Sequence, residues 1–266
     1  MQTVTRKKTG ALQIQDKARA HDDVYDAIER SILFQQILAQ AMGNDYPPDS
    51  TQYSFVGMQG LRWLAKRIES APDGTCIDLG CGDGSLSVWL HRLCGRKITG
   101  CDISEKAISI AKKKAHIDCD FVVSDFCQLP FDNGSVTAIS ALDCIQHAQS
   151  PLLLANELAR ISVPGTRFLF THWMRLLAPK ILAQYDPLCL ALHTAKFRIK
   201  EVFNLDPSLN MQFRVYAYVH ANQGLLEEKL GSTLFHSLIS EARHLHPVRN
   251  DVGHLAVSAI WNPDLD

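Results

Sequence analysis

Three aspartates lie in or directly after short apolar runs, at nearly even intervals. Asp78, Asp102 and Asp125 are separated by 24 and 23 residues. A carboxylate at the end of a parallel strand can accept hydrogen bonds from both hydroxyls of a ribose. The spacing therefore predicts a nucleoside site, with Asp102 on the ribose. The alternative is that Asp102 and Asp125 only cap the helices that follow them.

A glycine-rich stretch surrounds the first aspartate and reads Cys76-Ile77-Asp78-Leu79-Gly80-Cys81-Gly82-Asp83-Gly84. The apolar run before it predicts a strand, and the apolar spacing of residues 85–90 predicts a helix. Glycines in such a loop allow positive φ angles and a close approach of the backbone to a ligand. The stretch lacks the lysine of a phosphate-binding loop and the G-x-G-x-x-G spacing of a dinucleotide loop.

The pattern D-x-G-x-G-x-G over residues 78–84 resembles the first motif of class I S-adenosylmethionine-dependent methyltransferases. The resemblance covers roughly residues 55–172 and includes the two later acid-ended runs and Leu129-Pro130-Phe131. It also includes Glu157-Leu158-Ala159-Arg160 with Pro164-Gly165, where Thr166 replaces the second glycine of the family pattern. The resemblance implies S-adenosyl-L-methionine as the cofactor and S-adenosyl-L-homocysteine as its product.

The resemblance also implies a set of cofactor-binding residues. In the family, the acid matching Asp125 takes the adenine amino group, and the next residues flank the ring. An N-terminal segment crosses the mouth of the donor pocket in related enzymes, where tyrosine rings can attract the sulfonium; the alternative is that both tyrosines only pack helices. The implied residues are Tyr25, Tyr53, Asp78, Gly80, Cys81, Gly82, Asp102, Ile103, Asp125, Phe126, Cys127, Leu142 and Asp143.

Candidate acceptor residues follow the fourth and fifth predicted strands. The stretch 142–147 resembles a D-A-x-x-H segment of glycine, sarcosine and related small-molecule methyltransferases, which places His147 against the acceptor. Histidine titrates near neutrality and suits a general base, which a hydroxyl acceptor needs and a neutral amine does not. The alternative is a helix-start histidine bonded to backbone. The candidate acceptor residues are Gln146, His147, Trp173, Tyr185 and Tyr216.

The alternation of predicted strands and helices indicates an α/β fold with a doubly wound, Rossmann-like sheet. The resemblance implies seven mostly parallel strands with the last antiparallel, N-terminal helices, and a helical lid inserted before the last strand. We expect an N-terminal arm and cap helix in residues 1–54 and the main domain in 55–266, with the lid at about 210–245. Expected strands are 75–79, 97–102, 120–125, 136–142, 167–171, 197–203 and 255–261; expected helices are 22–42, 55–70, 104–115, 152–161, 175–192 (broken near Pro187), 210–230 and 233–245.

Composition fits one ordinary enzyme domain. With 266 residues, 46% of them hydrophobic, the chain can bury one large core and a cap. A net charge of −1 argues against a nucleic-acid partner. The eight cysteines contain no Cys-x-x-Cys pair and predict reduced thiols in the cytoplasm. We expect no signal peptide, membrane span or metal site, and a monomer or homodimer.

The sequence therefore predicts methyl transfer to an oxygen or nitrogen atom of a small organic molecule, such as a natural-product intermediate. Two alternatives stay open. One is an enzyme of the same fold that binds the cofactor but catalyses a cyclisation or pericyclic step. The other is a non-catalytic cofactor-binding subunit, which would bind the donor without turnover.

Overall fold

The computed structural model describes residues 18–19, 21–23, 25, 31–51, 53–114, 119–206, 210–245, 247 and 250–264. Within these residues, seven strands form one sheet in the order β3-β2-β1-β4-β5-β7-β6. All neighbouring strands from β3 to β5 are parallel, and β7 runs antiparallel to both β5 and β6. The predicted fold class is confirmed. The strands are β1 (Thr75–Leu79), β2 (Ile98–Asp102), β3 (Cys119–Val123), β4 (Val136–Ala141), β5 (Ser162–Arg175), β6 (Phe197–Asn204) and β7 (Val252–Trp261).

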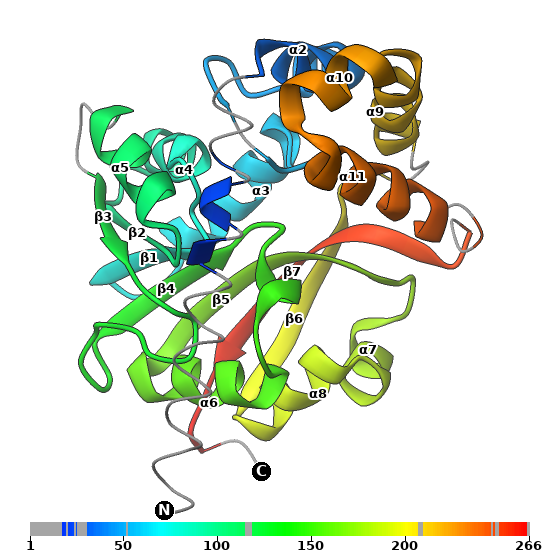
Figure 1. The fold of residues 1–266 in the computed structure, drawn as a ribbon. Coiled ribbons are helices and arrows are strands. Elements are labelled where there is room, and N and C mark those ends of the chain that lie inside the picture. The colour runs from blue at the N-terminus through cyan, green and yellow to red at the C-terminus, as the bar shows by residue number, and fades with distance from the viewer. Residues whose placement is uncertain are drawn as a thin grey trace, which may run out of the picture.

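Helices cover both faces of the sheet (Figure 1). On one face α3 (Met58–Glu69), α4 (Ser85–Cys94) and α5 (Glu105–Lys114) pack through their apolar stripes. On the other face α6 (Pro151–Ile161), α7 (Pro179–Tyr185) and α8 (Pro187–Thr194) pack through their apolar side chains. Because both faces are buried, β4 is buried along its whole length, as expected for a central parallel strand.

A separate group of helices lies over the carboxyl ends of the strands (Figure 1). It consists of α2 (Ile32–Met42), α9 (Asn210–Ala221), α10 (Gln223–Leu230) and α11 (Ser232–Leu245), and we call it the helical cap. Its members share an apolar core that includes Phe34, Leu38, Val219 and Leu238. The cap therefore joins an N-terminal helix to a segment inserted between β6 and β7.

Several predicted element boundaries change in the structure. The predicted helix over 175–192 begins only at Pro179, because β5 extends to Arg175 beside β7. The predicted break near Pro187 is confirmed, since α7 ends at Tyr185 and α8 begins at Pro187. Asp186 caps α8 by accepting hydrogen bonds from the N–H groups of Leu188 and Cys189. The inserted segment forms three helices rather than two. Residues 24 and 26–30 lie outside the described residues. Of the predicted helix over 22–42, residues 22, 23 and 25 are helical, and α2 covers its C-terminal part.

Among the described residues, no helix combines the length and the apolar character that a membrane span requires.

Candidate active site

The glycine loop links β1 to α4 and needs glycine for steric reasons. Gly80 and Gly82 have φ angles of 61° and 55°, in the left-handed region that side-chain-bearing residues rarely adopt. A Cβ atom on Gly80 would collide with the side chain of Cys144. The ring of Phe126 approaches the same position from the loop after β3. The loop is therefore packed between segments that follow β3 and β4.

Asp78 is a buried acid on β1 that hydrogen-bonds to residues on either side of the glycine loop. Its carboxylate accepts hydrogen bonds from Ser87 Oγ (2.5 Å) on α4 and Ser140 Oγ (2.6 Å) on β4. Burial raises the pKa of Asp78, and the two serine hydroxyls partly offset that effect. The side chain therefore ties β1, α4 and β4 together directly beneath the loop.

Asp102 and Asp125 lie beside the loop, at the ends of β2 and β3. Gly82 N–H and Ser104 N–H each donate to the Asp102 carboxylate at 2.9 Å. Burial raises the pKa of Asp102, and these backbone hydrogen bonds work in the opposite direction. Asp125 accepts from Cys127 N–H at 2.9 Å. Ile103 follows Asp102 and is half-buried. The three acids thus meet at one edge of the sheet, because parallel strands end at the same edge.

Part of the N-terminal segment lies on the glycine loop, near the centre of Figure 1. Tyr25 is half-buried, and a Cβ atom on Gly82 would collide with its hydroxyl. Burial and then the nearby carboxylates of Asp102 and Asp83 raise the pKa of Tyr25 well above its usual value. Asp22 accepts from Ser104 Oγ at 2.5 Å, at the start of α5. These contacts anchor the segment over the predicted nucleoside site.

The space that remains beside Tyr25 is small. A cavity of about 30 Å³ lies next to the loop. Ligand sites for small organic molecules measure about 300–1,000 Å³. A nucleoside can therefore enter only if the Tyr25 side chain moves away. The cavity is lined by Tyr25, Tyr53, Ser54, Asp78, Gly80, Cys81, Gly82, Asp83, Leu86 and Leu142.

A second cavity of about 510 Å³ lies between the helical cap and the segments after β4 and within β5. Tyr53 and Ser54 line both this cavity and the small one, so the two are neighbours. Its volume falls in the range of small-molecule sites. It is lined by Phe34, Leu38, Tyr53, Ser54, Phe55, Asp143, Gln146, His147, His172, Trp173, Ser240 and His244.

Asp143 connects the walls of this larger cavity. Its carboxylate accepts from Ser54 Oγ (2.8 Å), Phe55 N–H (2.9 Å) and Thr171 Oγ1 (2.6 Å), and it pairs with His254 Nε2 at 2.6 Å. Burial alone would raise the pKa of Asp143, but the His254 pair and the hydroxyl donors outweigh burial and hold it well below its usual range. Asp143 also has a φ angle of 50°, which is uncommon for a residue other than glycine. The resemblance places Asp143 beside the donor, whereas its carboxylate here binds protein groups.

His254 and Ser54 are site residues that the sequence interpretation missed. His254 on β7 has no exposed surface, and Trp173 stacks on its ring at a centroid distance of 4.6 Å. Its partner Asp143 is 111 residues away in the sequence, so no local spacing could have revealed the pair. Among the described residues, no group of three His, Cys, Asp or Glu side chains could hold a metal ion.

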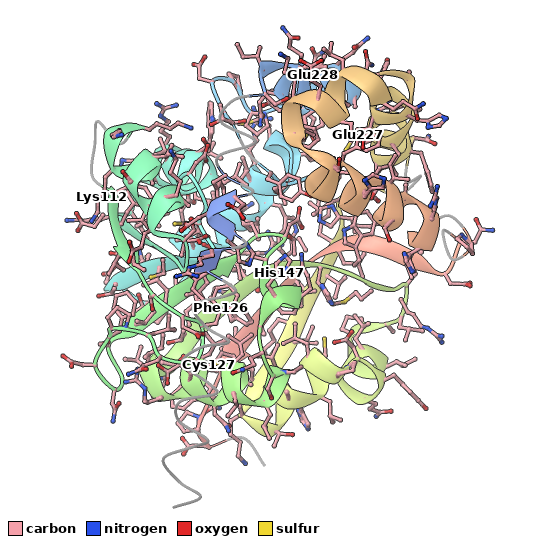
Figure 2. The ribbon with its side chains drawn as sticks, viewed as in Figure 1. Lys112, Phe126, Cys127, His147, Glu227 and Glu228 are labelled. Carbon is pink, nitrogen blue, oxygen red and sulfur yellow. The ribbon has the colours of Figure 1, made fainter. Side chains whose placement is uncertain are left out.

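His147 belongs to a short 3-10 turn, Ile145–His147, directly after β4. It is exposed and lines the larger cavity, and the ring of His21 meets it edge-on at 5.2 Å. Figure 2 shows His147 between the sheet and the helical cap, with Phe126 and Cys127 on the neighbouring loop and Lys112, Glu227 and Glu228 on outer helices. His172 lines the same cavity, and burial lowers its pKa.

The other candidate acceptor residues divide into two groups. Gln146 and Trp173 line the larger cavity, as the sequence predicts for them. Tyr185 on α7 is 72% exposed and does not line it. Tyr216 on α9 is buried in the helical cap, where its hydroxyl accepts from Gln212 Nε2 at 2.6 Å. It is also absent from the cavity lining, where Phe55 lies instead.

Comparisons with known proteins agree with this architecture. Residues 77–170 match a family model described as a methyltransferase domain. Cycloartenol-C-24-methyltransferase 1 of Oryza sativa subsp. japonica is 28% identical over 42% of this chain and 34% of its own length. Methyltransferase GfsG of Streptomyces halstedii is 25% identical over 56% of this chain and 60% of its own length. The chain thus spans between about a third and three fifths of these relatives.

Two solved structures share the fold over most of the chain. The [4+2]-cyclase SpnF has a TM-score of 0.65 at 19% identity, covering 93% of this chain and 96% of that chain. A putative sarcosine dimethylglycine methyltransferase from Galdieria sulphuraria has a TM-score of 0.66 at 15% identity, covering 79% and 87%. At these identities the similarity shows the fold alone.

Proposed function

We propose that the chain is a class I S-adenosylmethionine-dependent methyltransferase and that it transfers the methyl group of S-adenosyl-L-methionine to an oxygen or nitrogen atom of a small organic molecule. The observation that carries this proposal is the pair of neighbouring cavities. The small one lies on the glycine loop, the larger one lies under the helical cap, and Tyr53 and Ser54 line both. A donor on the loop would therefore face an acceptor in the larger cavity across these two residues.

The residues on the donor side fit an adenosine group. The positive φ angles of the loop let its backbone approach the ligand closely. In this proposal Asp102 accepts hydrogen bonds from the ribose hydroxyls and Asp125 accepts one from the adenine amino group. Support comes from their positions beside the glycine loop, which the Phe126 ring also approaches. When bound, S-adenosyl-L-methionine supplies an activated methyl group. The protein then aligns the acceptor and excludes water.

We further propose that residues 1–54 act as an arm and cap, and that residues 210–245 act as a lid on the domain formed by 55–266. Support comes from the shared apolar core of α2 with α9 to α11. All eight cysteines are free thiols, which supports a reducing compartment such as the cytoplasm. The partner in this proposal is the small-molecule acceptor.

The direct test is the mass of the product. Incubation with S-adenosyl-L-methionine and a metabolite extract is expected to produce S-adenosyl-L-homocysteine and a metabolite heavier by one methylene group. A second candidate is a cyclisation step, which the fold allows because a [4+2]-cyclase has the same fold over 93% of this chain. Cyclisation would leave the substrate mass unchanged and produce no S-adenosyl-L-homocysteine.

Asp102→Ala is expected to weaken binding of S-adenosyl-L-homocysteine by about 1–3 kcal/mol, because the ribose hydroxyls would lose their acceptor. Titration calorimetry measures the change. Asp120→Ala is the matched control, since Asp120 is an exposed acid on β3 that pairs with Lys97. If the Asp102→Ala variant bound S-adenosyl-L-homocysteine as tightly as the wild type, the assignment of Asp102 to the ribose would be wrong.

Tyr25→Ala is expected to raise the association rate constant of S-adenosyl-L-homocysteine. The half-buried Tyr25 ring lies over the loop, so the donor must displace it, and burial of a large apolar side chain stabilises by at most about 1.5–3 kcal/mol. Removing that competition should accelerate association about 10- to 100-fold, measured by surface plasmon resonance. Tyr25→Phe keeps the ring and should behave like the wild type. Slower or weaker binding by the alanine variant would mean that Tyr25 contacts the donor directly.

A further inference from the structure

The walls of the larger cavity are mainly apolar. Phe34 and Leu38 reach it from α2, Phe55 from the segment before α3, and Trp173 from β5. The Tyr53 ring lies against Phe34 at a centroid distance of 5.8 Å. These side chains come from the cap and from the sheet, so a ligand between them would be enclosed from two sides. Such walls favour a ligand with a large apolar surface.

Charged side chains contribute little to the cavity. Asp143 is the one acid among its described lining residues, and no lysine or arginine lies among them. The Asp143 carboxylate already takes three hydrogen bonds from Ser54, Phe55 and Thr171 and pairs with His254. It is therefore occupied within the protein and is a poor partner for an ammonium group. A phosphate or carboxylate would find no lysine or arginine to pair with there, and burying an unpaired charge is costly.

The polar groups that do face the cavity suit neutral hydrogen-bonding partners. Gln146 and His147 lie on the turn after β4, His172 on β5, and Ser240 and His244 on α11. Burial disfavours the charged form of His172. Amide, hydroxyl and neutral imidazole groups bind hydroxyl, carbonyl and ether oxygens. The positive sulfonium of the donor would also repel a cationic acceptor at short range.

We infer that the acceptor is an uncharged, largely apolar molecule that carries a hydroxyl group, and not a phosphorylated, carboxylated or ammonium-bearing one. This inference rests on the proposed function, in which the larger cavity holds the acceptor. The apolar body would lie against α2 and Trp173. The hydroxyl would lie near His147, on the side of the cavity that adjoins Tyr53 and Ser54 and thus the donor.

The test compares ligands that share a tail and differ in the head group. Geraniol and farnesol are titrated against geranyl diphosphate and farnesyl diphosphate by calorimetry, with and without saturating S-adenosyl-L-homocysteine. We expect at least one alcohol to bind at least tenfold more tightly than its diphosphate. Equal or tighter binding of the diphosphates, or binding of neither alcohol, would overturn the inference.

A charge variant makes the test sharper. Ser240 is an exposed lining residue on α11, so Ser240→Lys adds a cation at the cavity without disturbing the core. We expect it to raise the ratio of diphosphate to alcohol affinity at least fivefold. Ser240→Gln is the uncharged control and should leave that ratio as it is in the wild type. The same ratio in both variants would show that charge at this cavity does not select the ligand.

Failure of the inference is distinguishable from failure of the proposed function. S-adenosyl-L-homocysteine is titrated alone, and its binding tests the donor site independently of the acceptor class. If it binds and the diphosphates outcompete the alcohols, the methyltransferase proposal stands and the acceptor class is wrong. If it fails to bind, the proposed function is wrong, whereas the alcohol titrations without it still report the chemistry of the cavity.

Discussion

His147→Ala will lower kcat by about 10²–10⁴-fold for a hydroxyl acceptor, because a general base contributes that much to proton removal. His147 lines the larger cavity on the turn directly after β4, where the acceptor oxygen is proposed to lie. The cationic donor disfavours a second positive charge nearby, so the imidazole should be neutral and able to accept the proton. Steady-state kinetics with the identified acceptor measures the loss.

Donor affinity separates this role from a structural one. His147 does not line the small cavity on the glycine loop, so S-adenosyl-L-homocysteine should bind the alanine variant as it binds the wild type. His193→Ala is the control, since His193 is exposed on α8 on the far side of the sheet. A large loss of donor affinity would make His147 part of the donor site. With a neutral amine as acceptor, the loss should be small and mostly in KM.

Asp143→Asn should destabilise the protein by about 1–3 kcal/mol, the usual cost of leaving buried hydrogen-bonding groups without a partner. The carboxylate side chain is only 9% exposed, and it accepts from Ser54, Phe55 and Thr171 as well as His254. An asparagine amide has one acceptor oxygen, and its NH₂ group would face groups that donate. Urea denaturation measures the free energy of unfolding.

The matched control is Asp120→Asn. Asp120 pairs with Lys97 on the surface, at 2.8 Å and with both side chains more than half exposed. Exposed pairs contribute about 0–1 kcal/mol, so this variant should stay close to the wild type. If Asp143→Asn were as stable as Asp120→Asn, the His254 pair would not stabilise the fold.

The stability difference between Asp143→Asn and the wild type should also depend on pH. The pKa of Asp143 is lowered in the folded protein, whereas the pKa of an aspartate in the unfolded chain is about 3.9. A lowered folded pKa stabilises above the unfolded value, and that contribution is lost as pH falls towards the folded value. The difference should therefore be constant from neutral pH down to about 5 and shrink below about 4. A difference that grows on acidification would contradict the assigned direction of the shift.

The arrangement of the three acids around the glycine loop could be predicted from the sequence because its signals are local. Each of Asp78, Asp102 and Asp125 stands at the end of a strand that its own apolar run predicts. A parallel sheet with helical crossovers brings those strand ends to one edge, so the local pattern already implies that the acids meet. The spacing of glycines in the loop is equally local.

The acceptor side depends on packing between distant segments. The Asp143–His254 pair joins residues 111 positions apart, and α2 meets α9 to α11 only in the folded cap. A residue type does not say which way its side chain points, which is why Tyr185 turned out exposed and Tyr216 buried in the cap. Only the tertiary structure placed Ser54 between the two cavities, because this position is set by contacts between elements and not by the period of any one of them.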